Sequence, residues 1–183
     1  MRFSIILPLL IGMAAGAAYA QTCPNGPNHS TRLELLHEVL RTAPDPIAAR
    51  RISNDLWAIW LQAPDEVAQE LLDHGMERMR LGDHLGAQTA FDRLVDYCPD
   101  FAEAYNQRAF SNFLQQRFDI ALLDLDRALE LNPRHLGALT GRALTLIELG
   151  QNEAAQTDLK AAVALNPWLN ERSLIIQPPG EDI

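Results

Sequence analysis

The feature that most constrains the fold of this chain is a repeat marked by proline. Pro133 follows Pro99 by 34 residues, and Pro167 follows Pro133 by the same interval. Leu-Asn precedes two of these prolines, at 131–132 and at 165–166. A single unit of this length cannot bury its apolar face alone, so the period predicts units that stack into a solenoid.

Other positions follow the same period and indicate two helices, A and B, in each unit. The small residues 24 and 12 positions before the prolines are Gly75, Ala109, Ala143, Ala87, Ala121 and Ala155, and the larger apolar residues eight positions before them are Phe91, Leu125 and Leu159. Small residues let helices A and B approach closely, and the larger residues fill the gap to the next unit. Proline lacks the N–H that a helix interior needs, so it ends helix B, whereas Gly82 and Gly150 end helix A.

Over residues 68–167 this pattern resembles the tetratricopeptide-repeat (TPR) family. The resemblance implies an all-α, right-handed helix-turn-helix solenoid of three TPR units, at 68–101, 102–135 and 136–167, within a repeat region of 64–167. It also implies a protein that works by binding another polypeptide.

Two positions of helix A depart from the family pattern. His74, Arg108 and Arg142 stand where leucine is usual, and Arg78, Asn112 and Leu146 stand at the later aromatic position. The B helices carry Asp92, Asp124, Asp126 and Asp158. We expect Arg108 and Arg142 to form partly buried ion pairs with some of these aspartates, because exposed pairs contribute little to stability.

The segments outside the repeats have their own patterns. Residues 21–30 contain proline and glycine and should form an irregular arm. Residues 31–63 predict a divergent helical pair of about repeat length, which we interpret as a degenerate fourth unit. Residues 168–176 can form a short capping helix over the last repeat, and 177–183 should be a flexible tail.

The first 20 residues are typical of a secretory signal peptide. Arg2 supplies positive charge, residues 3–15 are almost entirely apolar, and residues 18–20 form a small-x-small cleavage site. We therefore expect cleavage near Ala20 and a mature protein that begins at Gln21, in the periplasm or outside the cell. An uncleaved anchor is the alternative, although the apolar run is short for a bilayer span, and no later segment is apolar enough to cross a membrane.

The chain has two cysteines, Cys23 and Cys98. In an oxidising compartment two thiols suggest one disulfide, and closing so long a loop would stabilise the fold by up to about 4 kcal/mol. Two free thiols are the alternative, because Cys23 lies in an irregular segment, and the sequence leaves both open. Without a CxxC motif, redox catalysis and thiolate metal sites are disfavoured.

Charge and motifs argue against nucleic acid and catalysis. A formal net charge of -9 repels phosphate backbones. The sequence contains no GxSxG, P-loop or GxGxxG motif. His74 and His84 could meet in space, but a metal site would need a third ligand from Asp73 or Asp83. We therefore expect no enzyme, no catalytic or metal-binding residue and no cofactor.

The best candidate site is the concave groove that the A helices line in TPR proteins. Carried over to this sequence, the groove positions are Leu72, Met76, Met79 and Arg80 in the first unit, Asn106, Phe110, Phe113 and Leu114 in the second, and Thr140, Leu144, Ile147 and Glu148 in the third. The stripe is largely apolar in all three units. It predicts a non-catalytic scaffold or adaptor that binds an apolar helix or an extended peptide of a protein partner.

Two alternatives for the groove stay open. The 31–42 or 47–61 segment could fill it from within, or a second protomer could fill it in a self-associating homodimer. The carboxylate clamp of chaperone-binding TPRs is not supported, because it needs paired Asn and basic residues. Here Asn106 stands largely alone, and Gly141 occupies a position where a basic group would be needed.

Overall fold

The computed structural model describes residues 22–176, so the predicted signal peptide (1–20) and tail (177–183) lie outside the described residues. The described part of the chain is helical, without strands. Its elements are α1 (Ser30–Arg41), α2 (Pro46–Trp60), α3 (Glu66–Arg80), α4 (His84–Tyr97), α5 (Ala102–Leu114), α6 (Phe118–Leu131), α7 (Leu136–Glu148), α8 (Asn152–Leu165) and the 3-10 helix η1 (Asn170–Leu174). None of these helices is long and apolar enough to cross a membrane.

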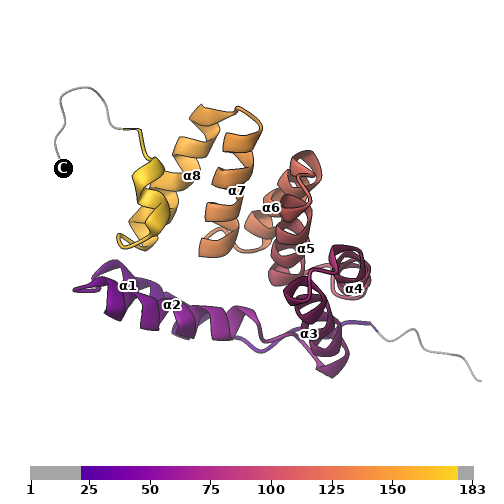
Figure 1. The fold of residues 1–183 in the computed structure, drawn as a ribbon. Coiled ribbons are helices and arrows are strands. Elements are labelled where there is room, and N and C mark those ends of the chain that lie inside the picture. Colours follow the sequence, from indigo (N-terminus) through magenta and orange to yellow (C-terminus); the bar gives the residue numbers. More distant parts are fainter. Residues whose placement is uncertain (1–21, 177–183) are drawn as a thin grey trace, which may run out of the picture.

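Three antiparallel pairs, α3–α4, α5–α6 and α7–α8, form the solenoid that the repeat predicts (Figure 1). The small residues at the recurring positions are buried between the helices of each pair. Gly82 and Gly150 have φ angles of 76° and 73°, a left-handed conformation that glycine adopts without steric cost. In the middle unit the equivalent residue is Gln116, with φ of 58°, so that turn keeps its shape at some conformational cost.

The predicted ion pairs between helices are confirmed. Arg108 on α5 contacts Asp124 of its own unit at 2.6 Å and Asp92 of the preceding unit at 3.0 Å. Arg142 makes the equivalent contacts one unit later, with Asp158 at 2.7 Å and Asp126 at 2.9 Å. Each arginine therefore joins two successive B helices.

The N-terminal pair does not stack onto α3 as a fourth repeat, so that expectation is wrong. α1 packs instead on α8, at the other end of the solenoid, and the pair lies across the ends of the later repeats (Figure 1). Leu40 of α1 is fully buried in the cluster that these repeats share. The Trp168 indole donates a hydrogen bond to the carbonyl oxygen of Ala43, 2.8 Å away, so the segment after α8 holds the α1–α2 turn.

The helix after α8 is also shorter than the sequence predicts. Only η1 forms within 168–176, and it is a five-residue 3-10 helix. It is held against α8 by Gln156, whose amide donates to the Leu174 carbonyl at 3.0 Å and accepts from the Ile176 N–H at 2.8 Å. These two bonds satisfy backbone groups that a longer helix would have paired internally.

The irregular arm begins at a disulfide between Cys23 and Cys98, which follows α4. Further along, the arm passes Pro64, close enough that a Cβ on Gly26 would lie 3.6 Å from the proline ring. The disulfide thus ties the start of the described chain to the α3–α4 pair, while α1 packs on α8.

Candidate functional site: a groove beside the A helices

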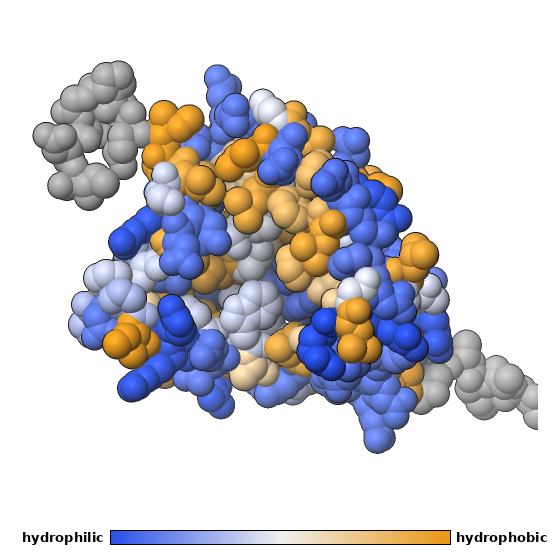
Figure 2. All heavy atoms as spheres, viewed as in Figure 1, coloured by the Kyte–Doolittle hydropathy of each residue, from blue (hydrophilic) through white to orange (hydrophobic). Residues whose placement is uncertain are grey.

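A pocket of about 570 Å³ opens between α2 and the A helices α3, α5 and α7. Figure 2 shows apolar side chains gathered around a hollow in the middle of this face, with hydrophilic side chains around them. Its lining residues are Trp57, Met76, Met79, Arg80, Asn106, Gln107, Ala109, Phe110, Phe113, Leu114, Leu125, Gly137, Thr140, Gly141, Leu144 and Thr145. Its volume lies within the range that ligand pockets usually have.

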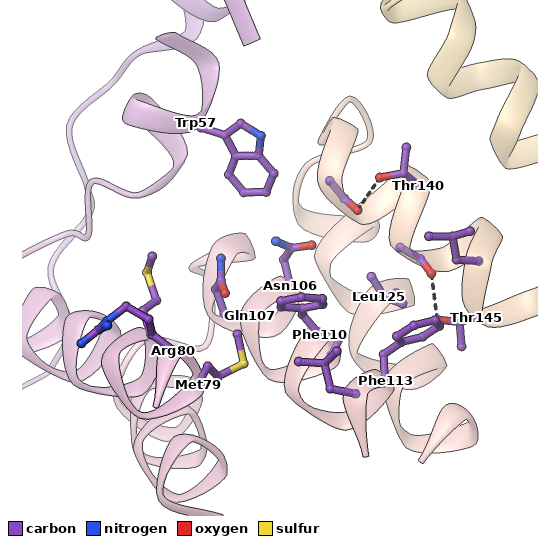
Figure 3. A pocket seen from close by; sticks show the side chains of 16 residues that line it. Trp57, Met79, Arg80, Asn106, Gln107, Phe110, Phe113, Leu125, Thr140 and Thr145 are labelled. Carbon is purple, nitrogen blue, oxygen red and sulfur yellow. Dashed lines mark hydrogen bonds between the residues drawn. The ribbon is translucent and has the colours of Figure 1, made fainter. Parts of the chain in front are cut away.

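Two methionine and three aromatic side chains are the largest apolar groups in the walls of the pocket (Figure 3). Met79 projects from α3, and Phe110 and Phe113 project from α5. Phe110 is 50% exposed, although burying a phenylalanine side chain away from water is energetically favourable. Two glycines on α7 line the pocket and let neighbouring side chains lie close to the helix: Trp57 lies against Gly137, and Leu125 lies against Gly141.

Two side-chain amides, Asn106 and Gln107 on α5, line the pocket next to each other. Both amide groups donate hydrogen bonds to the buried carboxylate of Glu103, at 3.2 Å and 2.5 Å. Because a carboxylate accepts hydrogen bonds, each amide must turn its NH2 group toward Glu103. This fixes the orientation of both side chains at the groove.

Glu103 is held from the other side by His135, which caps the N-terminus of α7. The His135 Nδ1 accepts the backbone N–H of Ala138 at 3.2 Å, so the proton of a neutral ring lies on Nε2. Nε2 then donates to Glu103 at 2.8 Å. Glu103 and His135 are buried and lie 32 residues apart in sequence, so this bond ties α5 to the N-terminus of α7.

An aromatic cluster on α2 connects this pair to the pocket wall. The Trp60 ring stacks on His135 with ring centres 4.2 Å apart, and Trp57 meets Trp60 edge-on at 5.4 Å. His37 of α1 lies behind Trp60, 6.2 Å between ring centres. Burial, with the nearby Arg134 and His135, lowers the pKa of His37 to about 4. The cluster positions Trp57 as the wall opposite α5 (Figure 3).

Most of the residues expected in the groove line this pocket, and three do not. Leu72 is fully buried in the core between α3 and α4, because its side chain points toward helix B. Ile147 and Glu148, at the C-terminal end of α7, lie beyond the pocket. On α7, the row of groove-lining residues therefore ends one helical turn earlier than the alignment of the repeats predicts.

Sequence reasoning missed Trp57 and Gln107 as pocket residues. Trp57 lies in the N-terminal pair, and its approach to Gly137 depends on how that pair folds back on the repeats; a Cβ on Gly137 would lie 2.6 Å from the indole. Gln107 follows the predicted Asn106 in the sequence. Glu103 lies one helical turn before both amides, and this spacing could have indicated that they share it as a hydrogen-bond acceptor. α2 contributes a wall and leaves the pocket hollow.

Within residues 22–176 no group of three or more His, Cys, Asp or Glu side chains is arranged to hold a metal ion. His74 and His84 do not combine with Asp73 or Asp83 into such a group. The side chains that line the groove offer apolar contact and hydrogen bonding.

The fold and the groove define an α-helical repeat protein, and comparison with known proteins identifies the repeats. Family models described as tetratricopeptide repeat match residues 102–135 and 136–167. The chain is a tetratricopeptide-repeat protein.

Two curated relatives illustrate the extent of the similarity. A TPR repeat-containing protein of Rhizobium etli is 28% identical over 147 residues, which cover 80% of this chain and 67% of that protein. Sperm-associated antigen 1 of Mus musculus is 34% identical over 93 residues, which cover 51% of this chain and 10% of that protein. The chain thus spans two thirds of the first relative and a tenth of the second.

Solved structures share the fold at low sequence identity. The first TPR of Spaghetti, bound to the HSP90 peptide SRMEEVD, has a TM-score of 0.57 and 23% identity, covering 58% of this chain and 85% of that chain. MamA has a TM-score of 0.53 and 24% identity, covering 72% and 74%. These similarities establish the all-α repeat fold.

Proposed function

We propose that this chain is a non-catalytic, exported TPR scaffold or adaptor that binds a segment of another protein in the groove between α2 and the A helices. The open apolar pocket, with Phe110 half exposed, is the observation that carries the proposal. Contiguous apolar surface of this kind usually marks a binding site. TPR structures solved with HSP90 and HSP70 peptides support the use of the fold for peptide binding.

Burial of apolar surface is the expected driving force. Covering the Phe110 and Leu114 side chains with a partner would remove apolar area from water, at about 25 cal/mol per Å². Met76 and Met79 suit an adaptable surface, because methionine side chains are flexible and polarizable. An apolar helix or an extended peptide fits this chemistry.

Export is supported by the pairing of Cys23 with Cys98, because disulfides persist in oxidising compartments. The signal peptide that the sequence predicts at residues 1–20 supports the same localisation. Cell fractionation followed by intact-mass spectrometry tests it. A periplasmic or secreted species that begins near Gln21 and carries no free thiol is expected; a cytoplasmic, full-length and reduced protein would contradict export.

The binding role is tested by pulldown from native extracellular or periplasmic extract with the wild type and the variant Phe110→Glu/Phe113→Glu. Ile120→Glu/Leu123→Glu is the matched control, because both side chains lie on α6 outside the groove and are 47% and 70% exposed. Helical content of each variant is checked by circular dichroism. Partners that wild type and control capture and the folded groove variant loses support the proposal, whereas partners retained by the groove variant contradict it.

Light scattering on the same proteins separates hetero-binding from self-association. A monomer is expected for the wild type. A dimer that the Phe110→Glu/Phe113→Glu variant loses would mean that a second copy of the chain fills the groove.

A further inference from the structure

The floor of the groove presents hydrogen-bond acceptors. The NH2 groups of Asn106 and Gln107 are both engaged by Glu103, which leaves the amide oxygens as the free ends of these side chains. Neither oxygen accepts a hydrogen bond from another described residue, and neither is among the buried atoms left without a partner. Figure 3 shows both amides at the pocket, between Trp57 and the α5 aromatic residues. A ligand that reaches this floor therefore needs a hydrogen-bond donor to pair with the two amide oxygens.

The charge behind this floor is negative. Glu103 accepts from three groups, the two amides and the His135 ring, whose Nδ1 accepts the Ala138 N–H, and no lysine or arginine contacts it in the described part of the chain. Arg80 is the one lining residue with a formal charge. Its guanidinium is held by Glu77 at 2.6 Å, on an exposed part of α3. A cation at the floor is attracted to Glu103, and a carboxylate is repelled.

The walls next to the floor also suit a basic side chain. Lysine and arginine bury an aliphatic stem against apolar surface while the charged head keeps polar partners. The Phe110 ring is half exposed beside the amides, and aromatic faces attract cations. Met79 supplies flexible apolar contact around the stem.

We propose that the groove selects an apolar peptide segment that carries a lysine or arginine, whose head group donates to the amide oxygens of Asn106 and Gln107 above Glu103. This inference rests on the proposed function, since it names the partner chemistry of the same groove. It also predicts that peptides with acidic side chains bind poorly. The peptide SRMEEVD, bound by the first TPR of Spaghetti, carries three acidic side chains against one arginine, so we expect it to bind weakly here.

Fluorescence anisotropy with defined synthetic peptides tests the proposal on the disulfide-bonded chain. Three labelled leucine–alanine–serine peptides of equal length differ at one central position, which is Lys, Gln or Glu, and SRMEEVD serves as a fourth probe. We expect the Lys peptide to bind at least about tenfold more tightly than the Glu peptide, with the Gln peptide between them and SRMEEVD weakest.

The variant Glu103→Gln assigns the preference to the buried charge. Gln keeps the size of the side chain but removes its charge and replaces one of its two acceptor oxygens with an NH2 donor, so the preference for Lys over Glu should fall to less than about threefold. Glu130→Gln is the matched control, because it makes the same change of net charge on the exposed surface of α6. It should keep the wild-type ranking, which excludes attraction by the overall acidity of the protein.

The outcomes distinguish this inference from the proposed function. Equal binding of the three central-position peptides, or tighter binding of the Glu peptide, overturns the inference and leaves the groove as an apolar peptide site. A preference for Lys that survives unchanged in Phe110→Lys overturns it too, because a fixed cation beside the floor should repel the lysine of the peptide. No binding of any probe by the wild type counts against both. If Glu103→Gln does not fold, the ranking on the wild type and on Phe110→Lys decides.

Discussion

Gly75 on α3 lies directly against the ring of Phe91 on α4, so closely that a Cβ on Gly75 would be 2.3 Å from the Phe91 Cε1. In the next two units the equivalent residues are also 16 positions apart, but their side chains differ in size. A larger Ala109 or Ala143 is matched by a smaller Leu125 or Leu159. The first unit thus pairs the smallest residue at the helix A position with the largest residue at the helix B position.

This relationship predicts strong coupling between the two positions. Gly75→Ala should lower the free energy of unfolding by roughly 1–3 kcal/mol through overpacking. Phe91→Leu should lower it by about 1–2 kcal/mol through a cavity. The double variant restores the arrangement of the later units and should be more stable than Gly75→Ala alone. Urea unfolding measures all three, and additive losses would show that the two side chains do not compete for space.

The arginine that bridges successive B helices should contribute to stability. Arg108 is 20% exposed and its partner Asp124 only 7%, so Arg108→Met leaves a mostly buried carboxylate without its cation. We expect a loss of roughly 1–3 kcal/mol in the free energy of unfolding. Arg127→Met is the control, because Arg127 pairs with the exposed Glu130, and it should change stability by less than about 1 kcal/mol. An unchanged thermal midpoint for Arg108→Met would refute the structural role.

His37 should make the fold sensitive to mild acid. Its pKa is about 4 in the folded chain, against a usual value near 6.5, so the unfolded state binds a proton first as the pH falls. The contribution of the neutral ring is complete above pH 6.5 and is lost progressively toward pH 4, by up to roughly 3 kcal/mol. Unfolding free energies between pH 7 and pH 4 should therefore fall less steeply in His37→Gln than in the wild type.

The exposed His74 provides the control for this pH series. His74→Gln should reproduce the wild-type slope, because His74 lies on the open surface of α3. Parallel slopes for the wild type and His37→Gln would show that burial of His37 does not govern the acid response.

Asn112 is a polar residue in the interior of the repeat region. It is fully buried on α5, and neither its amide nitrogen nor its oxygen has a hydrogen-bond partner in the described structure. Leu146 occupies the equivalent position of the third unit. Asn112→Leu removes two unpaired polar atoms, so we expect a gain of about 1–2 kcal/mol in the free energy of unfolding. A loss of stability in thermal unfolding would mean that the site needs a polar side chain.

Much of the repeat region could be predicted because its pattern is local and periodic. The positions of proline and small residues determine where helices begin and end and which faces meet. The ion pairs of Arg108 and Arg142 followed from the same period, since each partner lies 16 residues away. Of the groove residues, Met76 and Phe110 were predictable for the same reason, whereas Leu72 was not, because the family pattern alone does not separate groove from core at that position.

The sequence by itself therefore determined the all-α repeat architecture, the helix boundaries and most of the A-helix side of the groove. Only the tertiary structure decided that α1 packs on α8, that Trp57 forms the opposite wall, and that Glu103 binds His135 and fixes the amides at the floor. Contacts within a unit repeat with the period and leave a pattern in the sequence. Contacts such as that of Trp168 with Ala43 join segments 125 residues apart; they occur once, so no periodicity records them.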